Sequence, residues 1–150
     1  MASEQNLTCI SLAAAADLST KQYYAVTVNS SGTVELCDAA GESVTGILQN
    51  DPTSGQIATV AVGGISKGIL GGTVASGAMV KTNSSGKFVS ASAAVVDTTE
   101  SLSGNAESVG SATDPVIGSY VFGIAVVGGV SGDIGQILIT HMGAIPTTAA

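Results

Sequence analysis

The sequence predicts an all-β protein, a small glycine-rich β-barrel or sandwich built from two similar strand-and-turn halves. Three observations lead to this fold class. Apolar and polar residues alternate over short runs, and clusters of Gly, Asn, Asp and Ser separate these runs. One pattern also occurs twice: residues 121–139 repeat residues 44–62 at a constant distance of 77 positions, and Asn-Ser-Ser-Gly stands at both 29–32 and 83–86.

The 150 residues are enough for one domain with a buried core. We expect an N-terminal arm at 1–18, a β body at 19–91 and 116–143, a loop insertion at 92–115 and a polar tail at 144–150. The arm, the insertion and the apolar loop at 126–130 have no match in the other half, so we expect them to carry the specific contacts of the protein.

The arm contains an apolar, alanine-rich run at 9–16, which fits either a short strand or a helical turn. So short a segment is not stable as an isolated helix, and an apolar arm left free in water favours aggregation. We therefore expect the arm to dock on a neighbouring subunit or partner, in the manner of an added strand.

Strands of the first half are expected on both sides of the first Asn-Ser-Ser-Gly turn. Residues 24–28 and 33–37 alternate with a period of two, and Gly32 can supply the positive φ that such a turn needs. The two runs therefore predict a hairpin. Further short strands are expected at 44–48 and 58–62, with a turn between them.

A glycine-rich segment at 63–72 holds five glycines in ten residues. Glycine at this density bends strands, so the segment predicts sharp corners of a small barrel. The second Asn-Ser-Ser-Gly turn then lies between two more predicted strands, at 74–81 and 87–89.

The two copies differ most in the insertion at 92–115, which carries four acidic residues, no lysine, and otherwise mostly Ser, Thr, Ala and Gly. We expect an exposed loop there. Strands are expected to resume at Val116 and to end near Met142.

The composition points to a large protein–protein interface. Charged residues make up only 10% of the chain, against roughly 25% in ordinary globular domains. The mean hydropathy is +0.47, yet no apolar run approaches the ~20 residues of a membrane helix. A chain with so few charges and no membrane span is expected to cover apolar surface with a partner.

The charge balance argues against nucleic acid as a partner. The net charge is −7, there is no arginine, and the only basic residues besides one histidine are Lys21, Lys67, Lys81 and Lys87. Binding to phosphates needs clustered Lys and Arg. An acidic protein without such clusters would be repelled by DNA.

No catalytic, cofactor-binding or metal site is expected, and the chain is not expected to be an enzyme. Gly64-Ile65-Ser66-Lys67-Gly68 fits the G-x-S-x-G pattern and His141 follows it, but that motif needs a strand-to-helix turn and no helical period flanks it. Neither His141 nor the two cysteines have metal-site spacing. Cys9 and Cys37 are expected to be reduced and buried.

Two segments of the first half resemble the capsid cement, or head decoration, proteins of tailed phages. Residues 17–26 read Asp-Leu-Ser-Thr-Lys-Gln-Tyr-Tyr-Ala-Val, and residues 46–52 read Gly-Ile-Leu-Gln-Asn-Asp-Pro. The family pattern has a Gly-x-Ala second half, which here is Gly123-Ile124-Ala125. The acidic insertion and the apolar residues 126–130 depart from that pattern.

The resemblance implies a structural virion protein on the outer capsid surface. Residues 1–6 have neither the positive n-region nor the apolar h-region of a secretory signal, so we expect synthesis in the host cytoplasm. Its partners would be the major capsid protein, whose subunits it would bridge, and further copies of itself, as a trimer rather than a dimer. We expect residues 9–16 and the loops of the second half to make these contacts. The alternative is a head-fibre or adhesin base whose 92–115 loop contacts a host surface.

Overall fold

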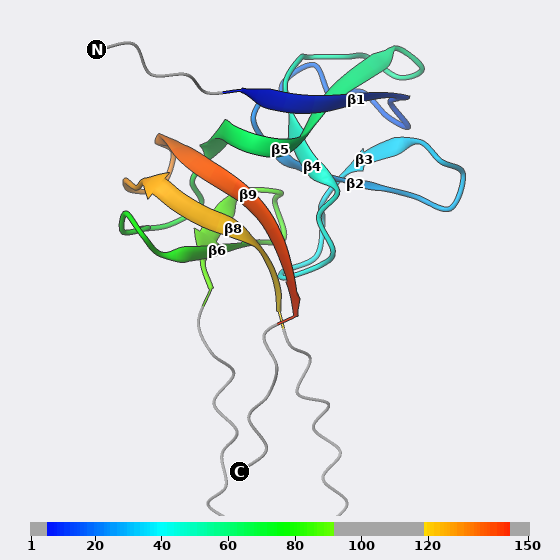
Figure 1. Cartoon of the computed structure of the whole chain (residues 1–150). Coiled ribbons are helices and arrows are strands. Elements are labelled where there is room, and N and C mark those ends of the chain that lie inside the picture. Colours follow the sequence, from blue (N-terminus) through cyan, green and yellow to red (C-terminus); the bar gives the residue numbers. More distant parts are fainter. Residues whose placement is uncertain (1–5, 92–118, 145–150) are drawn as a thin grey trace, which may run out of the picture.

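The computed structural model describes residues 6–91 and 119–144. These residues form nine β-strands joined by turns and loops, and no helix (Figure 1). The all-β, barrel-like fold predicted from the sequence is confirmed. The strands are β1 (Leu7–Ala13), β2 (Ala25–Val28), β3 (Val34–Leu36), β4 (Gly46–Leu48), β5 (Ile57–Ile69), β6 (Met79–Thr82), β7 (Phe88–Ser90), β8 (Tyr120–Val127) and β9 (Ile134–Ala144). Four predicted parts lie outside the described residues: residues 1–5 of the arm, the insertion at 92–115, the strand start at 116–118 and residues 145–150 of the tail.

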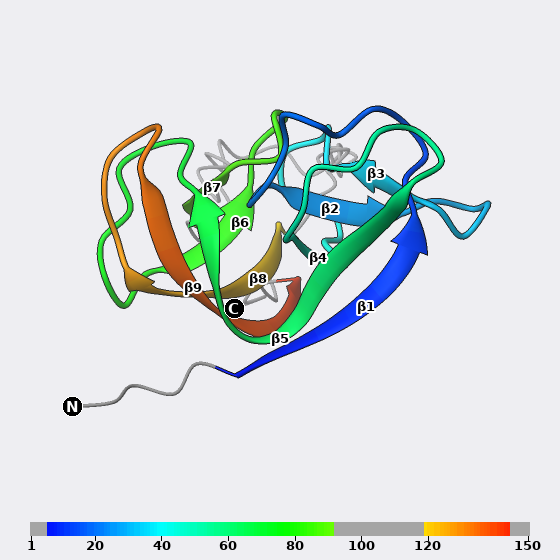
Figure 2. The same ribbon diagram turned by 90° about the horizontal axis from the view of Figure 1, so that it is seen from above.

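One antiparallel sheet contains all nine strands, in the order β3-β2-β4-β5-β9-β8-β6-β7, and β1 pairs with β5 beside this path. Figure 2 shows two groups of strands side by side, with β5 running from one into the other. We call residues up to Val62 the first half and residues from Gly63 the second half.

The two halves pair their strands in the same register. In the first hairpin Val26 pairs with Leu36, and in the second Val80 pairs with Ser90, each residue 54 positions after its counterpart. Likewise β4 and β5 pair at Leu48 and Val60, whereas β8 and β9 pair at Ala125 and Ile137, 77 positions later. The repeat seen in the sequence is therefore a repeat of structure.

Strand β5 belongs to both halves. Its first part is the last strand of the first half, where Thr59 pairs with Ser11 of β1. Its second part is the first strand of the second half, where Lys67 pairs with Gln136 of β9. These two pairs correspond, since Lys67 lies 56 positions after Ser11 and Gln136 lies 77 positions after Thr59.

Each half curls until its two ends meet. An isolated parallel bridge joins Ala14, just after β1, to Val34 of β3, and a second joins Leu70, just after β5, to Phe88 of β7. The same bridge at corresponding places closes both halves, so the sheet forms two small barrel-like units that share β5.

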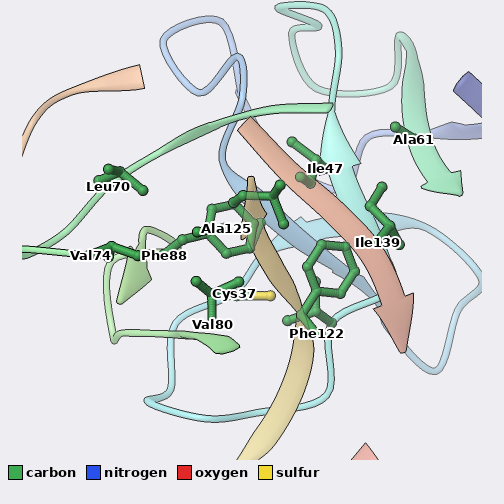
Figure 3. Close-up of a cluster of buried hydrophobic side chains, with 13 residues drawn as sticks. Cys37, Ile47, Ala61, Leu70, Val74, Val80, Phe88, Phe122, Ala125 and Ile139 are labelled. Carbon is green, nitrogen blue, oxygen red and sulfur yellow. The ribbon is translucent and has the colours of Figure 1, made fainter. Parts of the chain in front are cut away.

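Each unit encloses a core, and the two cores use corresponding positions. The first core consists of Ala14, Leu18, Val26, Val34, Leu48, Ala58 and Val60. Their counterparts in the second half are all buried: Leu70, Val74, Val80, Phe88, Ala125, Gly135 and Ile137. These second-half side chains, Gly135 excepted, belong to one cluster with Phe122, and Figure 3 labels all of them except Ile137. The Phe122 ring stacks on that of Phe88 at 5.6 Å between centroids.

Two expectations from the sequence need correction. The apolar arm does add as a strand, but to β5 of its own chain, where seven residues of β1 pair and Ala14 is buried, because β5 offers an open edge. The glycine-rich segment 63–72 does not form corners throughout, since β5 continues through Gly63 and Gly64 to Ile69. Only Gly64 in that part of the strand has a positive φ, of 92°.

Candidate functional site

The serine of the G-x-S-x-G pattern lies in the middle of strand β5 rather than at a strand-to-helix turn. Ser66 is buried, with 2% of its surface exposed. Its hydroxyl donates to the carbonyl oxygen of Lys67 at 3.0 Å and accepts from Nε2 of Gln49 at 2.8 Å. The Gln49 bond ties strand β5 to the residue that follows β4, so the hydroxyl has a structural role.

His141 lies on β9, where both ring nitrogens are occupied. Nε2 donates to the carbonyl oxygen of Val62 at 3.1 Å, and Nδ1 is hydrogen-bonded with the Tyr120 hydroxyl at 3.0 Å. Neither partner is Ser66, so the two residues that fitted the hydrolase pattern do not form a pair. His141 instead joins β9 to β5 and β8.

No group of three metal-ligating side chains occurs in residues 6–91 and 119–144. The two cysteines are both free, and they differ in environment. Cys37 is fully buried, as expected. Its burial is the main cause, and a hydrogen bond with Glu42 the second cause, that raises the pKa of its thiol far above the usual range. Cys9 is exposed on β1, which corrects the expectation that both thiols are buried.

The feature that distinguishes the surface is its exposed large apolar side chains. Four belong to the first half and seven to the second. They are Leu7, Ile10, Val28 and Ile57, and Met79, Val126, Val127, Val130, Ile134, Leu138 and Met142. Scattered apolar residues are normal on a protein surface, but a contiguous patch of exposed apolar side chains marks a contact surface.

Strand pairing brings four of the apolar side chains of the second half into one continuous row across the sheet. Met79 of β6 pairs with Ile124 of β8, Ile124 pairs with Leu138 of β9, and Leu138 pairs with Ile65 of β5. Directly paired residues project from the same face of a sheet with Cβ atoms about 5 Å apart. We call these four residues the apolar row; Met79 and Leu138 are 49% and 36% exposed, and the other two are half-buried.

In the first half, three of the four counterparts of the apolar row are covered. Ala25, Ile47 and Ala61 are fully buried, and they belong to one cluster with Phe122 and Ile139 of the second half (Figure 3). The fourth counterpart, Cys9, which pairs with Ala61, is exposed. Thus the face by which the first half contacts the second is the same face that the second half leaves open. The sequence alone did not reveal this face, because it depends on which strands pair.

The strands and surfaces described above define a class of protein: an all-β chain of two barrel-like units with an open apolar face. No helix in the described residues is long and apolar enough to cross a membrane. No known protein family matches the chain, and no curated protein matches it.

Among solved structures, the chain is similar to the head fiber gp8.5 N base in bacteriophage phi29. The two share 15% sequence identity with a TM-score of 0.58, over 94% of this chain and 99% of that chain. At this identity the likeness establishes a common fold.

Proposed function

We propose that this chain is a structural protein of a tailed-phage virion that attaches to the outside of the head. The observation that carries the proposal is the fold shared with a head fiber base along almost the whole length of both chains. The first-half segments that resemble head decoration proteins point to the same place on a virion.

The apolar row supplies the contact that attachment needs. Met79 and Leu138 are the most exposed of its members, and the chain has few charges to oppose burial of that face. Stable interfaces bury on the order of 1,600 Å² with an apolar centre. In this proposal the major capsid protein covers the row and its surroundings, and copies of the chain associate with one another as a trimer.

Two functions fit a protein attached to the head. As the base of a head fibre it would hold an adsorption structure, which the likeness to the gp8.5 N base favours. As a cement protein it would bridge major capsid subunits and stabilise the shell, which the many exposed apolar residues favour. Multiple contacts on a regular shell would add avidity in either case.

Sedimentation of the purified chain with heads that lack it tests the attachment. We expect saturable binding at a fixed number of copies per head. Leu138→Gln is expected to weaken binding by at least about tenfold, because it places an amide in the centre of the interface. Val28→Gln is the matched control, since Val28 is 37% exposed but lies outside the row.

The same heads distinguish the two functions. A cement protein raises the temperature at which heads break open, whereas a fibre base leaves this temperature unchanged and alters adsorption to host cells. Failure of the wild-type chain to bind heads at micromolar concentration would refute both functions.

A further inference from the structure

Three of the four lysines lie over the rings of two tyrosines that are adjacent in the sequence. Nζ of Lys21 lies 5.1 Å from the centre of the Tyr24 ring and Nζ of Lys87 lies 5.9 Å from it. Nζ of Lys67 lies 5.6 Å from the centre of the Tyr23 ring. We call these five residues the lysine–tyrosine cluster. At such distances the rings attract the ammonium groups and hold the long side chains in place.

The cluster lies where the two halves meet. The backbone N–H of Tyr23 donates to the carbonyl of Leu48 in the first half, and its carbonyl accepts from Ile69 N in the second, at 2.7 and 3.0 Å. The backbone N–H of Ala25, which follows Tyr24, donates to the carbonyl of Gly86 in the second half at 2.8 Å. Backbone bonds to both halves therefore fix the two tyrosines.

The repeat does not explain the lysines. The counterpart of Lys67 in β1 is Ser11, and the counterpart of Lys87 in the first hairpin is Thr33. Each lysine thus occurs at only one of two equivalent scaffold positions, the one that faces the junction. A purely structural requirement of the fold would apply to both copies.

Tyr23 has a positive φ, and the residue at the corresponding position of the second half is a glycine. Its φ is 67°, whereas Gly77, 54 positions later, has a φ of 84°. Positive φ costs free energy for a residue with a Cβ, and such residues concentrate at functional sites. Part of the Tyr23 ring packs on the core, and the rest carries Lys67.

The three ammonium groups have no carboxylate partner among the described residues, although the net charge of the chain is −7. Four of the six described carboxylates bond elsewhere: Asp17 accepts from Ser19 N, Glu35 from Asn29 Nδ2, Glu42 from Ala39 N and Asp133 from Val130 N. Within the described part of the chain, the lysines over these two adjacent tyrosines therefore carry positive charge that no carboxylate pairs.

We propose that the lysine–tyrosine cluster binds the carboxylates of an acidic surface segment on the protein to which this chain attaches. This inference rests on the proposed function and adds the chemistry of the partner. Because the rings already restrain the lysines, binding loses less side-chain entropy than it would with free lysines. An extended polyanion such as DNA would be repelled by the rest of the chain, so the matching partner is a short acidic segment.

The test compares charge variants of the full chain in sedimentation with heads. The triple variant Lys21→Gln, Lys67→Gln, Lys87→Gln is expected to bind about tenfold more weakly at low salt, and the difference should nearly vanish at about 0.5 M salt. The matched control is Lys81→Gln, whose ammonium group donates to Ser119 Oγ outside the cluster. It should change the affinity less than about twofold. Arginine at the same three positions should keep the binding.

The outcomes separate the two proposals. Wild-type chain that fails to bind heads refutes the attachment itself. Wild-type chain that binds, together with a folded triple variant that binds equally well at low salt, overturns the cluster as a binding site. If the triple variant melts at a lower temperature than the wild type, the single variant Lys67→Gln replaces it in the test, because Lys67 is exposed and its substitution should not affect folding. If the Lys67→Gln variant binds heads as well as the Lys81→Gln variant does, the proposal is also overturned.

Discussion

Gly46 and Gly123 occupy the same position in the two halves, and neither has room for a side chain. A Cβ at Gly46 would collide with the carbonyl oxygen of Ala61, and a Cβ at Gly123 would collide with that of Leu138. Ala61 and Leu138 are themselves 77 positions apart, as the two glycines are. The duplication therefore extends from sequence motif to register and to individual close contacts.

Gly46→Ala and Gly123→Ala are each expected to lower the free energy of unfolding by about 3 kcal/mol, since the added methyl group pushes paired strands apart. Gly72→Ala is the control, because a Cβ there meets only Val89 at an ordinary 3.7 Å. Its expected effect is below about 0.5 kcal/mol. Urea unfolding measures all three, and equal stability of the Gly46 and Gly72 variants would contradict the close approach.

The buried hydroxyl of Thr82 has no hydrogen-bond partner among the described residues. The counterpart of Thr82 in the first hairpin is Val28, an apolar residue of the same shape. We expect Thr82→Val to raise the free energy of unfolding by about 1 kcal/mol, because it removes an unsatisfied polar group without leaving a cavity. Thr82→Ser, which keeps the hydroxyl and loses the methyl, should lower it. A loss of stability in the valine variant would show that the hydroxyl is satisfied.

Cys37 makes stability depend on alkaline pH. Burial and the Glu42 bond raise the pKa of its thiol in the folded chain, whereas the unfolded chain loses this proton near pH ~8.5. Above that pH the unfolded state binds fewer protons, so stability falls as pH rises, by up to about 1.4 kcal/mol per pH unit. Thermal melting from pH 7 to 10 measures the fall.

The control for this pH dependence is Cys37→Ala, in which the part of the decline that comes from the thiol should be absent. A thiol reagent should label one cysteine of the native chain, the exposed Cys9, and both after unfolding. Native labelling of both cysteines would contradict the burial of Cys37.

Removal of residues 2–13 tests the part played by β1. This deletion takes away the seven residues that pair with β5 and leaves an unpaired strand edge. We expect a lower melting temperature and aggregation, measured by calorimetry and light scattering. Deleting residues 2–5, which lie before β1, should leave both unchanged; an unaltered melting temperature in the longer deletion would show that β1 is dispensable.

The sequence was sufficient to predict the hairpins and the duplication, because alternation and turn residues act locally. The two Asn-Ser-Ser-Gly turns illustrate this: in each, the Asn side chain accepts from two backbone N–H groups, those of Ser31 and Thr33 in the first turn. The second turn repeats these bonds 54 positions later.

Longer-range features could not be predicted in the same way. The arm has the composition of a contact segment, and only the open edge of β5 decides that it pairs within its own chain. The apolar row combines residues from four strands, and the lysine–tyrosine cluster combines three segments. Such sites depend on which strands become neighbours, which alternation along the chain does not encode.

The most direct test of attachment to the head is an electron cryomicroscopy reconstruction of heads saturated with this chain. We predict density for the β body on the outer face of the shell, with Met79 and Leu138 turned toward the major capsid protein. Density in which both side chains face solvent would contradict the apolar row as the contact, and the absence of density at saturating concentration would contradict head attachment itself.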